Sequence, residues 1–589
     1  MQITRVFDLL TNLEQICPDK PDMLSRRVHG QWIKFSTKEY VNFSHSVARS
    51  LLSLGLPKGT KVISITSNRP EWNFIDMGCA LANMVHTPIY PTLSADDFLY
   101  IFNHSDAEVI FIGNEILYKK IYPVVEQLER KVKVVLIDDC ESQYCFKQFL
   151  QEGEKNREAL EAKITENIAN TDKDEFFSLI YTSGTTGRPK GVMLSHYNLV
   201  FDSHSHAIRQ TYNSSHKMIS FLPLCHVYER TMNYEYQELG ISIYYAENIG
   251  TFASDLADCH ADGFCAVPRV LEMMYAKLEA AGHSLKGLKK CIYSSAWKYA
   301  NHYDNYNKKF FYQLRHSLFD KLVYSKWRAN LGGRNLLVGS GGSAIQEKIV
   351  RCFNAANFSL NEGYGMTETS PVISVNNPRD GINIFGTVGT VIDDTTLKFA
   401  DDGEILVKGP HVMLGYYKDP EQTAQIIDSD GFLHTGDIGV LIEGKYLKIT
   451  DRKKEIFKLS NGKYIAPLAL ETKLKGSDFI QDCMVVGENQ KFPSAIIIPE
   501  MNKLIAYAKA ENISFTDNDD LLSKEKIQKK LHSEVTASNA SLAAHEQIKK
   551  EVYINDEWTT ANNMLSQTLK LKRAKIYERY KDIIEDIFK

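Results

Sequence analysis

The segment from residue 181 to residue 191, YTSGTTGRPKG, has the strongest chemical character in this chain. It places three glycines, four serine or threonine hydroxyls and Lys190 within eleven residues, directly after an apolar run. Glycines let several backbone N–H groups converge on one anion, while the hydroxyls and the lysine add donors and a positive charge. This composition predicts a loop that binds phosphate.

The order of residues in this loop differs from that of the nucleotide-binding P-loop. Lys190 follows Pro189 and precedes Gly191, whereas the P-loop lysine follows a glycine and precedes serine or threonine. Residues 192–194 predict a strand after the loop, where a P-loop is followed by a helix. A GTPase-type site is therefore excluded. A flexible polar turn would rarely combine this glycine spacing with Pro189 and Lys190.

Four further segments decide what kind of phosphate chemistry the loop serves. They read NEGYGMTET (361–369), DGFLHTGDIG (430–439), DRKKEIFKLSNG (451–462) and TLKLKR (568–573). Together with the glycine-rich loop, and in the same order, they resemble the motifs of the AMP-forming adenylating enzymes. That superfamily includes acyl-CoA synthetases, peptide-synthetase adenylation domains and firefly-type luciferases. Residues 67–97 resemble its N-terminal region, so the resemblance covers essentially the whole chain.

The resemblance implies an ATP site with magnesium. Tyr364 would stack on adenine, Thr367 would approach the α-phosphate, and Glu368 and Thr185 would hold the metal ion. An aromatic ring is a flat apolar platform, and a carboxylate is a suitable ligand for a hard cation. The residues expected to bind ATP are Thr182, Ser183, Gly184, Thr185, Thr186, Gly187, Lys190, Gly341, Gly342, Ser343, Glu362, Gly363, Tyr364, Gly365, Thr367, Asp437 and Arg452.

The C-terminal motifs imply a second set of roles. Asp437 would accept hydrogen bonds from the ribose hydroxyls, with Arg452 on the ribose side. Lys454 would be the hinge between two domains, and Lys570 would be the catalytic lysine. Coenzyme A would meet the loop that contains Lys458, Ser460 and Gly462.

The implied reaction has two steps. A carboxylate attacks the α-phosphate of ATP and expels pyrophosphate, and a thiol then displaces AMP from the acyl-adenylate. The first step brings one anion against a polyanion, so positive charge must be placed beforehand. Losing Lys570 should slow this step by roughly 10² to 10³ or more. A large rotation about Lys454 would withdraw Lys570 before the thiol enters.

The segment GSGGSA (339–344) formally satisfies a dinucleotide-binding fingerprint, with Glu362 about twenty residues further on. Read alone, it predicts an NAD-dependent oxidoreductase. However, Glu362 lies inside NEGYGMTET. The resemblance instead implies that Gly341, Gly342 and Ser343 border the adenine and acyl pocket.

Two segments resemble the long-chain fatty acyl-CoA synthetase branch, namely FLPLCHVYER (221–230) and VPRV (267–270), and the insertion between Gly282 and Gly333 agrees. His226 would lie near the acyl carboxylate as a fourth catalytic residue beside Lys570, Glu368 and Thr185. A structural histidine at a strand end is the alternative. No buried aspartate that would suit an amino-acid substrate is identifiable, and a luciferase would share the same motifs.

The leading hypothesis is therefore a long-chain fatty acid to CoA ligase that uses ATP, Mg²⁺ and coenzyme A. One alternative transfers the acyl group to an acyl carrier protein. Another is a nucleotide- or lipid-binding regulator without catalysis. Lys570 argues against the regulator, because a pure binder has no use for a lysine that stabilises a transition state.

The elements that must position these residues alternate along the first half. Short β-branched runs at 61–66, 108–112, 132–137 and 177–181 predict strands, and residues 37–54 predict a helix capped by Ser36 or Thr37. This pattern is typical of an α/β fold with parallel-type sheets covered by helices. Glycine-rich short strands at 386–447 predict a β-barrel-like subdomain.

The charged run at 451–458 predicts the domain boundary, with a large N-terminal domain of residues 1–451 and a small mobile α+β domain of residues 452–589. The small domain contains apolar segments at 483–486 and 494–498. A Lys-rich helical stretch is expected at 521–552.

Composition limits the remaining classes. The chain has 589 residues, 43% hydrophobic and 24% charged, and a net charge of −4 from 69 basic and 73 acidic side chains, which does not favour a nucleic-acid partner. The ten cysteines are spread singly along the chain, which indicates a reducing compartment. No secretory signal and no spanning segment is apparent, so we expect a soluble cytoplasmic protein. A peripheral position at the inner face of a membrane, transient membrane contact and a homodimer stay open.

Overall fold

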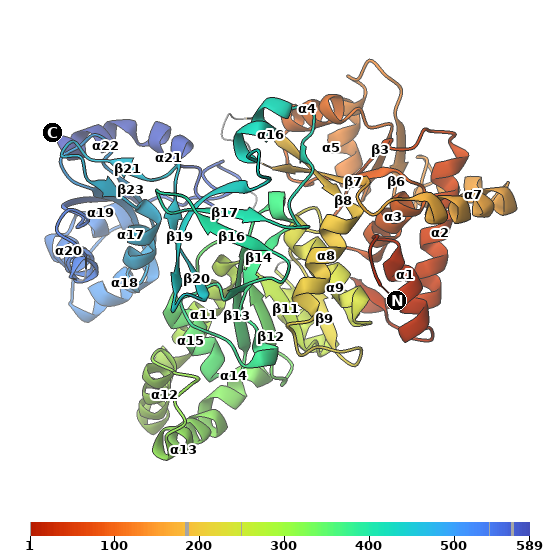
Figure 1. Ribbon diagram of the computed structural model, residues 1–589. Coiled ribbons are helices and arrows are strands. Elements are labelled where there is room, and N and C mark those ends of the chain that lie inside the picture. Colours follow the sequence, from red (N-terminus) through yellow and green to blue (C-terminus); the bar gives the residue numbers. More distant parts are fainter. Residues whose placement is uncertain (1, 183–187, 249, 541, 567–569) are drawn as a thin grey trace. The chain divides into compact units, whose positions relative to one another are not determined.

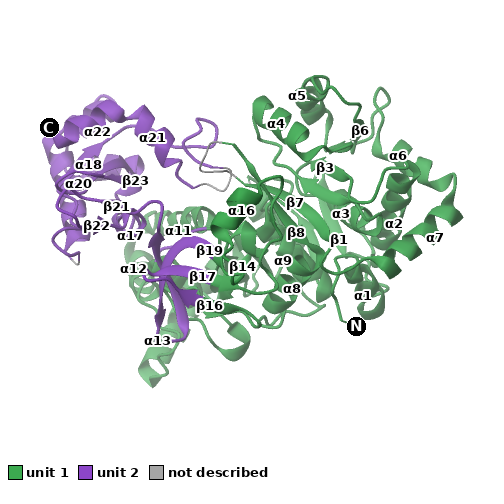
Figure 2. Cartoon of the chain, turned by 45° about the horizontal axis from the view of Figure 1, so that its top comes forward, with its two compact units in different colours: residues 1–342, 347–397, 407–433 green, residues 343–346, 398–406, 434–589 purple. Residues whose placement is uncertain are grey.

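The computed structural model describes residues 2–182, 188–248, 250–540, 542–566 and 570–589. The chain forms two compact units (Figure 2). Unit 1 comprises Met1–Gly342, Glu347–Leu397 and Val407–Leu433, and unit 2 comprises Ser343–Gln346, Lys398–Leu406 and His434–Lys589. The domain boundary expected after residue 451, and its mobility, stay predictions.

Unit 1 contains a seven-stranded sheet in the order β18-β8-β7-β4-β3-β5-β6 (Figure 1). Its strands are β3 (Lys61–Ile65), β4 (Val85–Pro88), β5 (Val109–Ile112), β6 (Lys133–Leu136), β7 (Phe176–Thr182), β8 (Lys190–Ser195) and β18 (Gly415–Tyr416). The strands from β7 to β6 pair in parallel, whereas β7–β8 and β8–β18 are antiparallel. The four strands predicted from β-branched runs are confirmed.

Helices pack on this sheet or on the helices that cover it. They are α2 (Thr37–Ser53), α3 (Pro70–Leu81), α4 (Ala95–Ser105), α5 (Glu115–Val125), α6 (Phe146–Glu154) and α7 (Arg157–Asn170). Ser36 caps α2 as predicted: its side chain accepts from the Glu39 amide, and the Glu39 carboxylate accepts from the Ser36 amide at 2.8 Å. Ile63, Phe98 and Ile110 are fully buried in the resulting core.

A nine-stranded sheet forms the rest of the unit 1 core, in the order β15-β14-β13-β12-β11-β9-β10-β1-β2. Its strands are β1 (Leu24–Val28), β2 (Gln31–Phe35), β9 (Lys217–Ser220), β10 (Ser242–Tyr245), β11 (Gly263–Ala266), β12 (Leu337–Ser340), β13 (Ser359–Gly365), β14 (Val372–Val375) and β15 (Thr390–Val391). The associated helices are α1 (Asp8–Ile16), α8 (His196–Ala207), α9 (Val227–Glu238), α10 (Phe252–Cys259), α11 (Pro268–His283) and α15 (Glu347–Ala355).

A group of helices is inserted between α11 and β12. It consists of α12 (Gly287–Ala300), α13 (Phe310–Phe319), the π-helical turn η1 (Asp320–Tyr324) and α14 (Ser325–Ala329). Figure 1 shows α12 and α13 side by side. The short helices η2 (Thr367–Thr369), η3 (Pro378–Asp380) and α16 (Pro420–Ile426) complete unit 1.

The glycine-rich region after residue 386 forms a four-stranded sheet in the order β16-β17-β19-β20. Its strands are β16 (Thr396–Phe399), β17 (Glu404–Lys408), β19 (Leu433–Ile442) and β20 (Tyr446–Arg452). A β-hairpin of β21 (Phe457–Lys458) and β22 (Tyr464–Ile465) follows in unit 2.

The rest of unit 2 is an α+β body, as predicted. It contains β23 (Ile480–Val486), β24 (Ser494–Pro499), β25 (Lys550–Tyr553), α17 (Pro467–Leu474), α18 (Met501–Ala510), α19 (Asn518–Ser523), α20 (Glu525–Asn539), α21 (Arg573–Arg579) and α22 (Lys581–Phe588). The helical stretch expected up to residue 552 is wrong at its end. The helix in this stretch, α20, stops at Asn539, and the residues Lys550–Tyr553 form a strand that pairs in parallel with β24. None of the helices among the described residues is long and apolar enough to cross a bilayer.

Candidate active site

The glycine-rich loop joins two paired strands. Thr182 ends β7 and Lys190 begins β8, and the two residues face each other in the antiparallel register. The strand after Lys190 confirms the expectation that separated this loop from a P-loop. Gly191 packs closely on Leu179: a Cβ atom there would lie 2.8 Å from Cδ1 of Leu179, which would have to shift. The predicted residues Ser183, Gly184, Thr185, Thr186 and Gly187 lie outside the described residues, so their roles stay predictions.

Tyr416 connects this loop to the second motif. It lies on β18 opposite Val192 of β8, and Nζ of Lys190 lies 5.2 Å from the centre of its ring. Its hydroxyl donates a hydrogen bond to Oε1 of Glu368 at 2.7 Å. Burial, together with the Glu368 carboxylate, raises the pKa of Tyr416. Sequence reasoning missed Tyr416, because an uncharged residue outside every motif has no chemical pattern to reveal it.

The NEGYGMTET segment leaves the sheet at the end of β13. Glu362, Gly363, Tyr364 and Gly365 belong to this strand, and Thr367 and Glu368 follow in η2, where both are buried. A Cβ atom on Gly365 would lie 1.7 Å from the carbonyl oxygen of Pro371, so no other residue fits. This tight turn brings the predicted adenine and phosphate residues to one end of the strand.

Glu362 differs from the other carboxylates of the segment. It is 8% exposed, and its Oε1 finds no hydrogen-bond partner among the described residues. Burial, with the nearby charge of Glu347, raises its pKa to about 8. Glu362 is therefore mainly protonated at neutral pH and can donate a hydrogen bond. A neutral carboxyl group suits a nucleotide base better than it suits a phosphate.

The glycine turn after β12 packs closely on an aromatic ring. A Cβ atom on Gly341 would lie 3.2 Å from Cζ of Tyr228, and the Gly341 amide donates to the Ala266 carbonyl at 3.2 Å. Gly342 has a φ of +86°, a left-handed conformation that favours glycine. Ser343 is exposed and belongs to unit 2. The ATP-binding roles of these three residues stay predictions.

His226 is the N-cap of α9. Its Nδ1 accepts a hydrogen bond from the amide of Tyr228 at 3.2 Å, which satisfies one free donor of the helix. This contact gives the residue a structural function of the kind weighed as the alternative. Its placement near an acyl carboxylate stays a prediction.

A buried ion-pair network lies one turn further along α9. Arg230 is fully buried, donates to Oδ1 of Asp76 at 2.5 Å and also contacts the hydroxyl of Ser178 on β7. Asp76 accepts two more hydrogen bonds, from Nδ1 of His86 at 2.6 Å and from the Tyr234 hydroxyl at 2.5 Å. These contacts raise the pKa of Arg230 and lower the pKa of Asp76 against the effect of burial. The network joins α3, α9 and the strand that leads into the glycine-rich loop.

In unit 2, the two residues predicted for the ribose lie together. Asp437 on β19 and Arg452 on β20 are opposite each other in the antiparallel register, and Nε of Arg452 donates to Oδ1 of Asp437 at 3.0 Å. Asp437 is only 4% exposed. An arginine on one oxygen holds the carboxylate in one orientation, which suits an acceptor for vicinal hydroxyl groups.

The predicted hinge and CoA residues lie in the turn after β20 and in the β21–β22 hairpin of unit 2. Lys454 is exposed in the turn after β20. Nζ of Lys458 lies 5.6 Å from the ring centre of Tyr464, and the Ser460 amide donates to the Gln490 carbonyl at 2.9 Å. Gly462 has a φ of +86° in the hairpin turn. Lys458 and Ser460 are exposed, so an incoming ligand could reach both from solvent.

Lys570 lies in unit 2 and pairs with Ser566 through its backbone. The Ser566 amide donates to the Lys570 carbonyl at 2.8 Å, and the Lys570 amide donates to the Ser566 hydroxyl at 3.1 Å. Arg573, three residues further on, donates to Oε2 of Glu471 at 2.6 Å and to Oε2 of Glu455 at 3.0 Å. The catalytic role of Lys570 stays a prediction.

Within the described residues, no three His, Cys, Asp or Glu side chains gather into a metal-binding group. Magnesium in nucleotide sites commonly uses one or two protein oxygen ligands together with phosphate oxygens and water. The buried carboxylate of Glu368, oriented by Tyr416, fits that requirement.

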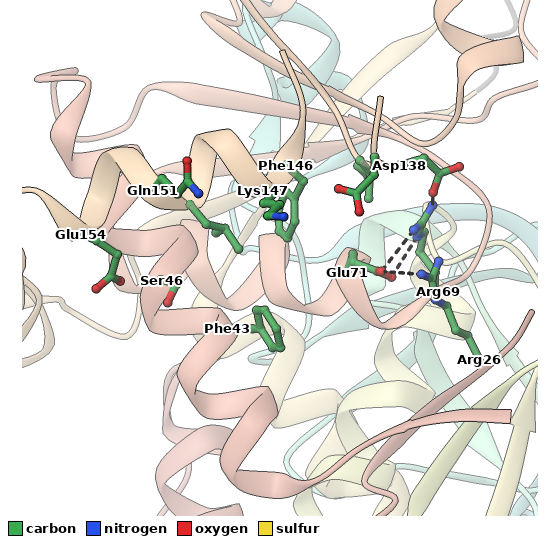
Figure 3. Close-up of a pocket in the computed structure, with 13 residues that line it drawn as sticks. Arg26, Phe43, Ser46, Arg69, Glu71, Asp138, Phe146, Lys147, Gln151 and Glu154 are labelled. Atoms are coloured by element: carbon green, nitrogen blue, oxygen red, sulfur yellow. Dashed lines mark hydrogen bonds and ion pairs between the residues drawn. The ribbon is translucent and has the colours of Figure 1, made fainter. Parts of the chain in front are cut away.

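A cavity of about 510 Å³ lies elsewhere in unit 1, between α2, α3 and α6 (Figure 3). Arg69 pairs with two of the acidic groups that line it: it donates to Oε2 of Glu71 at 2.9 Å and to Oδ1 of Asp138 at 2.8 Å. None of the predicted site residues lines it. The motif residues, rather than this cavity, therefore define the candidate active site.

Comparisons with known proteins show the family of the chain. Residues 14–417 match the family model described as AMP-binding enzyme, and residues 454–589 match the AMP-binding enzyme C-terminal domain. The chain therefore belongs to the AMP-binding enzyme family, as the motifs predicted.

Similar proteins align along almost the whole chain. The peroxisomal long chain acyl-CoA synthetase 7 of Arabidopsis thaliana is 30% identical over 95% of this chain and 82% of its own length. The long-chain-fatty-acid–CoA ligase FadD15 of Mycobacterium bovis is 29% identical over 97% of this chain and 95% of its own length. The adenylation domain of a carboxylate reductase from Mycobacterium chelonae has the same fold, with a TM-score of 0.75 at 20% identity over 99% of this chain and 91% of its own.

Proposed function

We propose that the protein is an AMP-forming long-chain fatty acid–CoA ligase. It activates the fatty acid with ATP, releases pyrophosphate, and transfers the acyl group from the adenylate to coenzyme A with release of AMP. The observation that carries this proposal is the match to long-chain acyl-CoA synthetases and ligases along 95% and 97% of the chain. The motif residues supply the chemistry that the reaction requires.

In the first step, the residues of unit 1 stabilise negative charge. Lys190 and the glycine-rich loop hold the outer phosphates, and Glu362 and Tyr364 hold the adenine. Magnesium, held at Glu368 and Thr185, supplies positive charge to the phosphate oxygens when it is bound. Tyr416 orients Glu368 for this function. Each interaction is worth most where charge accumulates as pyrophosphate leaves.

Unit 2 contributes the ribose contact and the catalytic lysine. Asp437, oriented by Arg452, accepts from the ribose hydroxyls. Lys570 neutralises the carboxylate and the α-phosphate as the new bond forms. Lys570 and Glu368 belong to different units. A rotation about Lys454 between the two half-reactions is part of the proposal. Lys458, Ser460 and Gly462 then receive coenzyme A.

An assay that separates the half-reactions tests the proposal. The protein is given ATP, Mg²⁺ and a panel of acids, including acetate, palmitate, coumarate and amino acids, first without a thiol. Among these acids, we expect only palmitate to cause pyrophosphate release. Adding CoA should then release AMP and form acyl-CoA. Faster pyrophosphate release with an amino acid or coumarate than with palmitate would contradict the proposed substrate. If no acid caused pyrophosphate release, the proposed ligase activity would be wrong.

The acceptor and the compartment belong to the same proposal. CoA is the proposed acyl acceptor. If AMP were released with an acyl carrier protein but not with CoA, the carrier protein would be the acceptor instead. All ten cysteines are free thiols, which supports a reducing compartment such as the cytoplasm. Two-fold assembly is tested by light scattering on the purified protein, where twice the chain mass of 67.0 kDa would show a homodimer.

A further inference from the structure

The helical insertion of unit 1 has an unusual exposed surface on α13. Large apolar side chains recur about every fourth residue along one side of α13 and η1. Their exposed fractions are 73% for Phe310, 81% for Phe311, 56% for Leu314, 54% for Leu318 and 37% for Leu322. We call these five residues the α13 apolar face. An exposed apolar patch of this size indicates a site of interaction with another protein or with a membrane.

The opposite side of α13 is firmly packed. The ring of Tyr312 lies 5.0 Å from that of Tyr299, and the ring of Phe319 lies 5.4 Å from it. His316 contacts the ring of Tyr303 at 5.1 Å, and its Nε2 lies 2.8 Å from the Ala355 carbonyl oxygen on α15. The helix therefore has its own core contacts, and the α13 apolar face is presented outward by a fixed element.

Positive charge surrounds the α13 apolar face. Residues 286–328 contain ten lysine or arginine and two acidic side chains, whereas the whole chain carries a net charge of −4. Lys308, Lys309 and Lys321 are exposed next to these apolar residues in the sequence. Arg315 is also exposed, with its guanidinium 5.3 Å from the ring centres of Tyr299 and Phe319. One of the two acidic groups, Asp320, is already paired with Arg328 at 2.6 Å. The local excess of positive charge is therefore available to an external anion.

We propose that α13 docks the protein on an anionic lipid bilayer. The apolar side chains would enter the boundary between headgroups and acyl chains, while the basic side chains would reach the lipid phosphates. A second copy of the chain is a poorer occupant, because two like-charged surfaces would face each other. The inference goes beyond the ligase activity and does not depend on it.

Vesicle co-sedimentation tests the docking surface. The full chain is mixed with phosphatidylcholine vesicles, with or without 30% phosphatidylglycerol as the anionic lipid. We expect binding to the anionic vesicles at low salt, with weaker binding in ~0.5 M NaCl because salt screens the attraction. Binding to neutral vesicles should be at least about tenfold weaker, since a basic side chain near an anionic surface contributes ~1 kcal/mol.

Two double variants separate the apolar and electrostatic contributions. Phe310→Ser with Phe311→Ser, and Lys308→Glu with Lys309→Glu, should each reduce binding by about tenfold or more. Ile116→Ser on α5 is the matched apolar control, because Ile116 is 80% exposed outside the insertion. Lys147→Glu with Lys155→Glu on and next to α6 is the charge control. All variants should retain ATP-dependent pyrophosphate release with an acid dissolved in buffer, which shows that they are folded.

A fluorescent label on α12, the helix next to α13, gives a second measurement. Cys291 on α12 is exposed, whereas the other nine cysteines are half-buried or buried. A polarity-sensitive dye on Cys291 should shift to shorter wavelength with anionic vesicles and stay unchanged with neutral ones. Equal binding of both vesicle types, undiminished binding of the α13 variants, or a homodimer that Phe310→Ser with Phe311→Ser dissociates would each overturn the proposal.

Discussion

The hydroxyl of Tyr416 donates a hydrogen bond to Oε1 of Glu368, with 2.7 Å between the two oxygen atoms. Tyr416 also pairs through its backbone with the strand that leaves the glycine-rich loop, and Lys190 lies over its ring. One residue thus joins the expected phosphate-binding loop to the expected magnesium ligand. A change at Tyr416 should therefore affect nucleotide chemistry although Tyr416 belongs to no motif.

Tyr416→Phe should lower kcat/KM for ATP by about 10- to 100-fold, because a hydrogen bond to a charged group typically contributes about 1.5–3 kcal/mol. It should also raise the magnesium concentration needed for half-maximal pyrophosphate release. Tyr417→Phe is the matched control, since it removes the same group from the next ring, which packs against Phe176. An unchanged magnesium requirement in Tyr416→Phe would show that Glu368 needs no such orientation.

Lys570→Ala should slow pyrophosphate release by roughly 10² to 10³, because the charge that offsets the approach of two anions is lost. Transfer to CoA from chemically prepared acyl-adenylate should stay within about twofold of the original rate, since that step does not need this charge. Lys572→Ala, two residues away, is the control; its side chain donates to Asn563. Equal slowing of both half-reactions would contradict the assignment.

Asp437→Asn should raise KM for ATP by about tenfold or more, since an amide accepts less strongly than a carboxylate and also brings a donor. Arg452→Gln should have a smaller effect in the same direction, because Arg452 orients Asp437. Asp402→Asn removes a carboxylate that pairs with Lys453 at 2.6 Å on the same sheet, and it should leave KM unchanged. Comparable KM values for all three variants would contradict a ribose contact at Asp437.

The raised pKa of Glu362 predicts a pH-dependent stability. The folded protein keeps this proton up to about pH 8, whereas the unfolded chain loses it near pH 4.3. The contribution of Glu362 to stability is therefore complete below the unfolded pKa, falls as pH rises from about 4.3 to about 8, and then stays low. Glu362→Gln should remove this part of the decline, so that its melting temperature exceeds that of the original protein most clearly at pH 9. If the melting temperatures of the two proteins changed in parallel across pH 5–9, the carboxyl group of Glu362 would be ionised in the folded protein throughout this range.

The Asp76–Arg230 pair predicts a large cost when one partner is removed. Arg230→Met should destabilise the protein by about 3–5 kcal/mol, because it leaves a buried carboxylate without its counter-ion. Asp76→Asn combined with Arg230→Met should recover part of that loss, since no net charge then stays buried. Thermal melting of the single and double variants measures the coupling. A double variant as unstable as the sum of the singles would show that the two charges do not act together.

Residue type and order were sufficient to predict the family, and some motif positions, such as Gly365 and Asp437, also have specific local surroundings. Gly365 has no room for a side chain, and Asp437 faces Arg452 in the strand register. Such local requirements appear in a sequence as fixed spacings. The strands of the first half were predictable for a similar reason, because β3 and β5 are buried on both faces and read as short apolar runs.

Long-range pairing could not be predicted in the same way. β1 pairs with β10, and β18 pairs with β8, although each pair is far apart along the chain. Nothing in Tyr416 itself announces that it meets Glu368. The helical prediction up to residue 552 failed for the same reason, because β25 is a strand only through its pairing with β24.

The position of β18 has a consequence for biosynthesis. Until Gly415 and Tyr416 have left the ribosome, β8 has no neighbour on its outer edge, and Glu368 lacks its phenol donor. A nascent chain that ends before this point would carry the glycine-rich loop on an open sheet edge, which other chains can join. Premature termination between β8 and β18 should therefore produce aggregates rather than a smaller nucleotide-binding protein.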